Sequence, residues 1–97
     1  MREYEVIVVL KPDLDEETQA GVLERLGGWL AQSDNEELKP KVDYWGLRSL
    51  AYPIKNYNEG YYIFYQTNLE SATIAAIERN ILYMDDVLRH LIVRKVS

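Results

Sequence analysis

Few side chains in this sequence have the chemistry of a catalytic or metal site. The 97 residues include no cysteine and a single histidine, His90. This composition excludes a thiolate nucleophile, a disulfide scaffold and a cysteine-based metal site, and one histidine cannot form a metal cluster alone. The sequence also has no glycine-rich phosphate loop and no nucleophile elbow. We therefore expect no enzyme activity, no cofactor, no metal and no small-molecule substrate.

Acidic side chains are plentiful, but they are concentrated in the first part of the chain. Residues 1–37 hold ten acids and three bases, whereas residues 38–97 hold six acids and eight bases, for a formal net charge of −5. The net charge argues against nucleic acid, whose affinity for proteins comes largely from phosphate contacts. The uneven distribution still allows the basic part to dock on a phosphate backbone. We expect modest affinity from charge alone, so that a partner protein is needed.

The residues best suited to binding lie between Trp45 and Gln66. This stretch contains two apolar, aromatic-rich runs, Tyr44–Ile54 and Tyr61–Thr67. Between them lies the polar link Lys55–Gly60, which has the asparagine and glycine that turns favour. The pattern predicts a long antiparallel hairpin.

The second run of this hairpin has large residues on both sides of the strand. A strand with one face in water normally alternates apolar with polar residues. One explanation is a fully buried central strand, and the other is a docking face for nucleic acid or protein, which phenol rings suit. Because Phe64 has no polar tip, we assign Tyr62 and Phe64 to the helices and place Tyr61 and Tyr65 on an open face.

The first third of the chain predicts a strand followed by a helix. Residues Arg2–Lys11 form a strand whose apolar centre indicates a central position in a sheet. Pro12 ends it, and Asp13 with Glu16 predicts a capped helix start. The helix that follows has one apolar stripe, formed by Val22, Leu23, Leu26, Trp29 and Leu30. Ser33–Lys41 is then a polar connection.

The remaining elements are the two strands of the hairpin, a second helix and a last strand. The strand Val42–Tyr52 precedes Pro53, which predicts an edge position, and its apolar residues change face near Arg48-Ser49, which indicates a bulge. After the hairpin's second strand, a helix over Glu70–Tyr83 has Ile74, Ile77 and Ile81 on its inner stripe. Val87–Val96 forms the last strand.

The order β-α-β-β-α-β predicts an α+β domain with the ferredoxin-like arrangement, one domain over residues 1–97. Two helices cover one face of a four-stranded antiparallel sheet, and the other face stays open. No apolar run approaches the ~20 residues of a membrane span and no signal-peptide pattern opens the chain. We expect a cytoplasmic protein without membrane contact.

Four stretches in order resemble the bacterial small-subunit ribosomal protein six family. They are Met1–Glu5 leading into Ile7–Val9, then Trp45–Ile54 (WGLRSLAYPI), Glu59–Tyr62 and Asp85–His90. The resemblance covers nearly the whole chain and implies the same ferredoxin-like fold. It also implies a non-catalytic ribosomal protein that binds the central domain of small-subunit ribosomal RNA as a heterodimer with the basic ribosomal protein eighteen.

By position, Arg2, Arg48, Tyr52 and Arg89 match family residues expected near RNA or the partner. The full set of predicted binding residues is Arg2, Tyr4, Arg48, Tyr52, Lys55, Tyr61, Tyr65, Arg89 and Arg94. Two alternatives remain for this fold, which are a free-standing RNA-recognition domain and a homo-oligomeric regulatory domain. The stretch Gly60–Tyr65 is similar to the aromatic strand motif of the first, although Glu59 replaces its leading basic residue.

Overall fold

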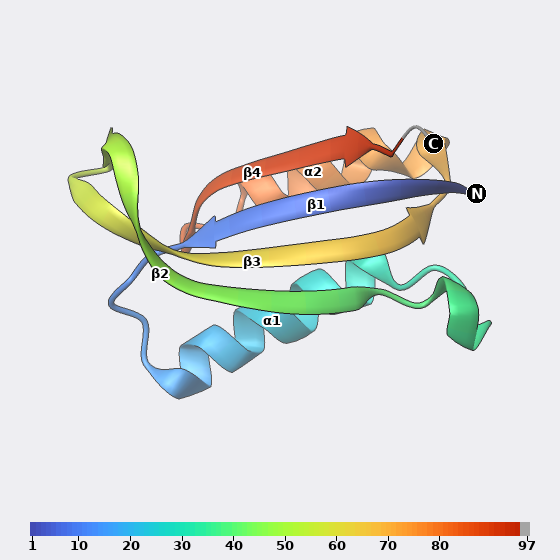
Figure 1. Cartoon of the computed structure of the whole chain (residues 1–97), viewed down its shortest axis with the longest axis horizontal. Coiled ribbons are helices and arrows are strands. Elements are labelled where there is room, and N and C mark those ends of the chain that lie inside the picture. The colour runs from blue at the N-terminus through green and yellow to red at the C-terminus, as the bar shows by residue number, and fades with distance from the viewer. Residues whose placement is uncertain (96–97) are drawn as a thin grey trace.

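A computed structural model describes residues 1–95 as one antiparallel sheet backed by two helices. The strands are β1 (Arg2–Leu10), β2 (Lys41–Ile54), β3 (Tyr57–Leu69) and β4 (Val87–Arg94), in the spatial order β2-β3-β1-β4. The helices α1 (Glu16–Leu30) and α2 (Ile74–Leu82) lie on one side of the sheet (Figure 1). We call the other side the open face. The predicted ferredoxin-like arrangement is confirmed, while Val96 of the predicted last strand lies outside the described residues.

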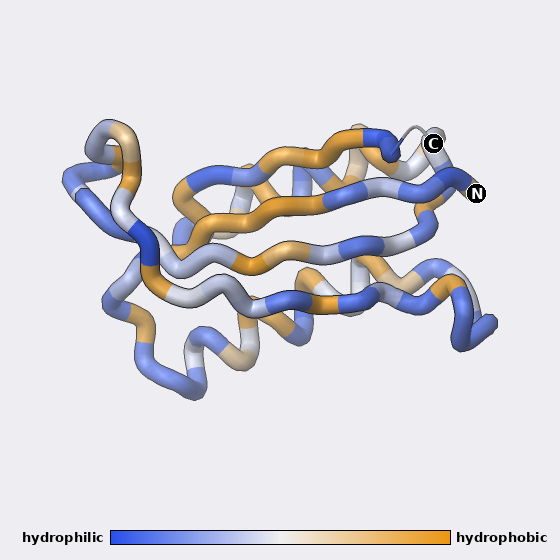
Figure 2. Tube along the Cα trace, in the orientation of Figure 1, coloured by the Kyte–Doolittle hydropathy of each residue, from blue (hydrophilic) through white to orange (hydrophobic). Residues whose placement is uncertain are grey.

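The core lies between the sheet and the helices. On β1, which is central as predicted, the side chains of Tyr4, Val6, Val8 and Leu10 are buried. The apolar stripes of α1 and α2 meet them through Val22, Leu26, Leu30, Ile77 and Ile81. Figure 2 shows hydrophobic segments in the second half of β1 and toward the C-terminal end of β4. Two short 3₁₀ turns, Glu36–Leu38 and Ser71–Thr73, complete the connections.

The first helix begins two residues later than the sequence predicted. Its N-cap is Asp15, whose carboxylate accepts a hydrogen bond from the Thr18 backbone N–H at 2.7 Å. That bond, together with one from the Thr18 hydroxyl, holds the pKa of Asp15 below its usual value. Leu14 packs against the core just before the cap, which fixes where the helix can start. Asp13 instead accepts a bond from the Tyr57 hydroxyl at 3.3 Å.

The β2–β3 hairpin turns through only two residues, Lys55 (φ 49°) and Asn56 (φ 69°). Two consecutive positive φ angles match a type I′ turn, whose twist suits the flanking strands. The predicted six-residue link was therefore too long, since its last four residues belong to β3. At its curled end, the hairpin extends beyond the rest of the sheet (Figure 1).

Strand β2 lies at the sheet edge, as Pro53 predicted, but its bulge is not at Arg48-Ser49. The register shifts between Tyr44 and Gly46, and again between Ser49 and Ile54. Gly46 has φ 81°, a conformation that glycine adopts without the steric penalty of a side chain. At the first shift the glycine accommodates the extra residue, and the second shift begins directly after Ser49, next to the predicted position.

The predicted orientation of β3 is wrong. Val8 pairs with Ile63, and Ile7 pairs with Phe64. Cross-strand partners share a face, and Val8 is buried against the helices, so odd-numbered β3 residues face the core. Tyr65 is 2% exposed, whereas Phe64 is half-buried on the open face. Phe64 has no polar group to contact water, and its ring is instead partly covered by stacking on the ring of Trp45.

Candidate nucleic-acid and partner interface

Two of the predicted binding residues lie on the open face. Arg48 pairs with Gly60 across β2 and β3, and Arg89 pairs with Val9 across β4 and β1. Both arginine side chains are exposed. They therefore lie on either side of the inner strands, with apolar and aromatic side chains between them.

A second group lies elsewhere on the molecule. Arg2 and Arg94 are exposed at the far end of the sheet, where Arg94 pairs with Tyr4. Tyr52, which is 59% exposed, and Lys55 lie on the extended hairpin. The predicted residues thus form no single cluster.

Three predicted tyrosines face the wrong way for a site on the open face. Tyr4 is 8% exposed and Tyr65 is 2% exposed, so both rings belong to the core. Burial, with a smaller contribution from electrostatic interaction with Tyr44, raises the pKa of Tyr65 to about 12. Tyr61 is half-buried and packs against the same core. Their placement follows from β1, whose buried even-numbered residues set the register.

Sequence reasoning missed the aromatic side chains that occupy the open face. The rings of Trp45 and Phe64 stack with centroids 5.2 Å apart and an interplanar angle of 11°. The guanidinium carbon of Arg48 lies 5.3 Å from the Trp45 ring centroid. The indole N–H of Trp45 donates a hydrogen bond to Asp43 at 3.1 Å. We call Phe64, Trp45 and Arg48 the Trp45 stack.

The bulge is what brings this stack together. In a regular strand, residues three apart point to opposite faces. The extra residue at Trp45-Gly46 removes one alternation, so that Trp45 and Arg48 share the open face. The signal in the sequence was the Trp-Gly pair, since glycine inside a strand often marks a bulge.

Beside the stack, the open face has a shallow hollow of about 150 Å³. Its lining is mainly apolar and comes from the inner strands and β4: Ile7, Val9, Tyr62, Arg89, His90 and Leu91. Leu91 is 48% exposed, and Val93 farther along β4 is 45% exposed. The open face therefore combines aromatic and aliphatic side chains with two exposed arginines.

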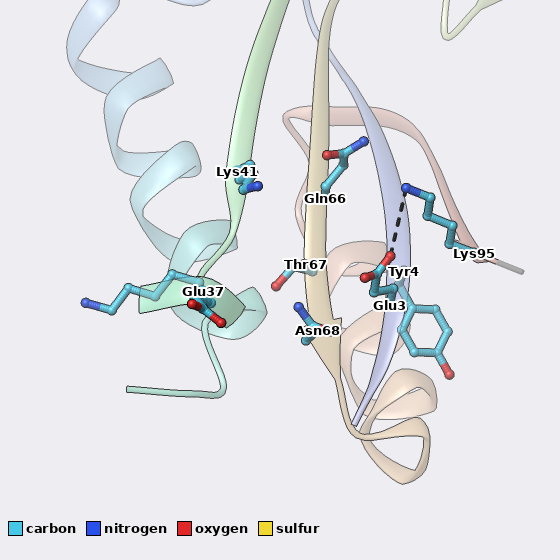
Figure 3. Close-up of a pocket in the computed structure, with 9 residues that line it drawn as sticks. Glu3, Tyr4, Glu37, Lys41, Gln66, Thr67, Asn68 and Lys95 are labelled. Atoms are coloured by element: carbon cyan, nitrogen blue, oxygen red, sulfur yellow. Dashed lines mark ion pairs between the residues drawn. The ribbon is translucent and has the colours of Figure 1, made fainter. Parts of the chain in front are cut away.

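A polar hollow of about 140 Å³ lies at the other end of the sheet (Figure 3). Its charged lining includes Lys39, Lys41 and Lys95 together with Glu3 and Glu37. Lys95 lies 3.9 Å from Glu3, as the dashed line in Figure 3 marks. The mixed charges largely offset one another, so this hollow has no strong preference for an anion or a cation.

Within residues 1–95, no group of three histidine, cysteine, aspartate or glutamate side chains is placed to hold a metal ion. No helix in that range is long and apolar enough to span a membrane.

Comparison with known proteins identifies the family. Residues 3–94 match the family described as Ribosomal protein S6. The chain belongs to the ribosomal protein S6 family. The small ribosomal subunit protein bS6 of Carboxydothermus hydrogenoformans is 37% identical over 95 residues, which cover 98% of this chain and 97% of that protein. The bS6 protein of Caldanaerobacter subterraneus is 40% identical over 94 residues, 97% of each chain.

A solved structure agrees with the S6 assignment. The crystal structure of 30S ribosomal protein S6 from Thermotoga maritima superposes with a TM-score of 0.78 at 26% identity, covering 97% of this chain and 87% of that one. Family membership makes this chain a structural protein of the small ribosomal subunit, located with the ribosome in the cytoplasm. It also confirms that the chain is not an enzyme, because the S6 family is structural.

Proposed function

We propose that this S6-family chain binds the central domain of small-subunit ribosomal RNA as a heterodimer with ribosomal protein eighteen. The observation that carries the proposal is the acidic surface of helix α1, with exposed arginines lying away from it on the open face. Helix α1 carries Glu16, Glu17 and Glu24 against the single base Arg25. Such a surface repels a phosphate backbone. RNA therefore approaches from another side.

The exposed arginines of the open face, Arg48 and Arg89, provide that side. Arg2 and Arg94 are also exposed, at the end of the sheet where the chain begins, but they pair with the core-facing Leu69 and Tyr4. An arginine on a phosphate releases counterions and contributes to affinity in proportion to the number of such contacts. These few contacts on a chain of net charge −5 give weak binding alone.

A basic partner compensates for the weak RNA affinity of this chain. It adds phosphate contacts of its own and covers the exposed apolar side chains of the open face, such as Leu91 and Val93. The proposal therefore divides the work between the two proteins. This chain supplies a rigid, partly aromatic surface and a few arginines, and the partner supplies most of the positive charge.

Filter binding to a central-domain RNA fragment tests the division, with this chain alone, the partner alone and both together. We expect weak retention by this chain alone and at least ten times tighter binding by the pair. Equal affinity of this chain with and without the partner would contradict the heterodimer. Light scattering of the free chain distinguishes the proposal from the homo-oligomeric alternative. The proposal expects the mass of a monomer, and the alternative expects at least the mass of a dimer.

A further inference from the structure

Within residues 1–95, the side chain of Arg48 contacts the ring of Trp45 and is paired with no acid. The three ion pairs found within residues 1–95 do not include it. The carboxylate of Asp43, on the same strand, instead accepts the indole N–H of Trp45. The cation–π contact with Trp45 forms no ion pair with the guanidinium, which leaves its N–H groups available to an anion.

Two contacts support the ring of Trp45. Phe64 lies against one face of the indole, and the bond to Asp43 fixes the rotation of the ring in its plane. Arg48 then lies over the indole at 5.3 Å. An exposed arginine normally loses much rotamer freedom when it binds, and a guanidinium that is already ordered loses less.

We propose that Trp45 is a positioning residue that holds the Arg48 guanidinium ready for a phosphate group of the RNA. The inference rests on the proposed function and adds to it the residue that sets the orientation of one phosphate contact. Trp45 touches no phosphate itself. Its contribution is transmitted through Arg48, so the two substitutions are coupled.

A double-mutant cycle on the assembled heterodimer and the RNA fragment measures this coupling. Arg48→Ala is expected to weaken binding about tenfold, and Trp45→Leu about threefold to fivefold, the range of an exposed cation–π contact. In the Arg48→Ala background, Trp45→Leu should cost no further affinity. Trp45→Phe, which keeps an aromatic face, should bind within about twofold of the parent.

Two further readouts separate positioning from general damage. Trp45→Leu keeps the arginine charge, so the salt slope of binding should stay unchanged while Arg48→Ala lowers it by about 0.7–0.9. Trp29→Leu removes a tryptophan from α1, away from the open face, and should leave RNA affinity unchanged. In the free protein, the Nε–H of Arg48 should be more ordered by NMR relaxation than that of Arg89, and Trp45→Leu should abolish the difference.

The outcomes distinguish this inference from the proposed function. Additive losses from Trp45→Leu and Arg48→Ala, or an Arg48 side chain as mobile as Arg89, would overturn the positioning role while RNA binding by the parent heterodimer stands. A parent heterodimer that fails to bind the RNA would overturn the proposed function itself. The NMR comparison remains decisive for Arg48 order in that case, because it uses no RNA.

Discussion

Arg48 lies over the ring of Trp45, three residues earlier in the same strand, with 5.3 Å between the guanidinium carbon and the ring centroid. A regular strand would direct these two side chains to opposite faces. The contact exists because the register shifts between Tyr44 and Gly46. One glycine at φ 81° thus determines what the edge strand presents on the open face.

Replacing Gly46 by alanine is expected to destabilise the protein by about 1–2 kcal/mol, since a side chain at this positive φ is strained. Urea unfolding measures the loss. Gly28→Ala is the matched control, because Gly28 is an exposed helical residue with open space around its Cβ position, and alanine there should stabilise by about 1 kcal/mol. Equal effects at both glycines would contradict the bulge.

Gly60 has a different requirement, which is close packing. A Cβ atom there would collide with the side chain of Val9 and lie 3.6 Å from Leu50 Cδ2. Gly60→Ala should therefore cost about 1–3 kcal/mol, as expected for overpacking. Combining it with Val9→Ala should cost less than the sum of the two single changes in urea unfolding. Strict additivity would show that the two residues do not compete for space.

The orientation of β3 can be tested by truncating neighbouring aromatic residues. Tyr65, which is fully buried, should lose about 3–5 kcal/mol of unfolding free energy on replacement by alanine. Phe64 is half-buried and rests on Trp45, so Phe64→Ala should cost less, about 1–2 kcal/mol. Urea unfolding of the two variants shows which substitution costs more unfolding free energy. A larger loss at Phe64 would restore the orientation predicted from the sequence.

Alkaline pH should weaken the fold through Tyr65. Its pKa of about 12 exceeds the ordinary value of 10, so the unfolded chain releases this proton first. Stability is therefore complete below about pH 10 and falls as pH rises from about 10 towards 12. The two-unit shift corresponds to a loss of about 3 kcal/mol once the pH exceeds both pKa values. Urea unfolding across this range should show the fall, and Tyr65→Phe should remove that part of it.

The fold was predictable because the sequence patterns that indicate it do not depend on the exact pairing of the strands. The apolar centre of Val6–Leu10 placed β1 inside the sheet, and Pro53 placed β2 at its edge. The stripes of both helices were visible in their spacing. The element order then left one arrangement to consider.

The binding face was harder to predict because the direction of β3 depends on its pairing partner. Tyr61–Tyr65 has large residues on both sides, so its own pattern fixes no direction. The register with β1 decides it, and a shift of one residue exchanges the faces. The bulge at Gly46 had the same effect on Trp45.

The salt dependence of RNA binding by the heterodimer tests the central claim most directly, which is that arginines of the open face contact phosphates. Arg48→Ala and Arg89→Ala should each reduce the slope of log affinity against log salt concentration by about 0.7–0.9. Glu24→Gln, on the acidic helix α1, should leave the slope and the affinity nearly unchanged. Unchanged slopes for both arginine variants, or an equal effect from Glu24→Gln, would contradict the account.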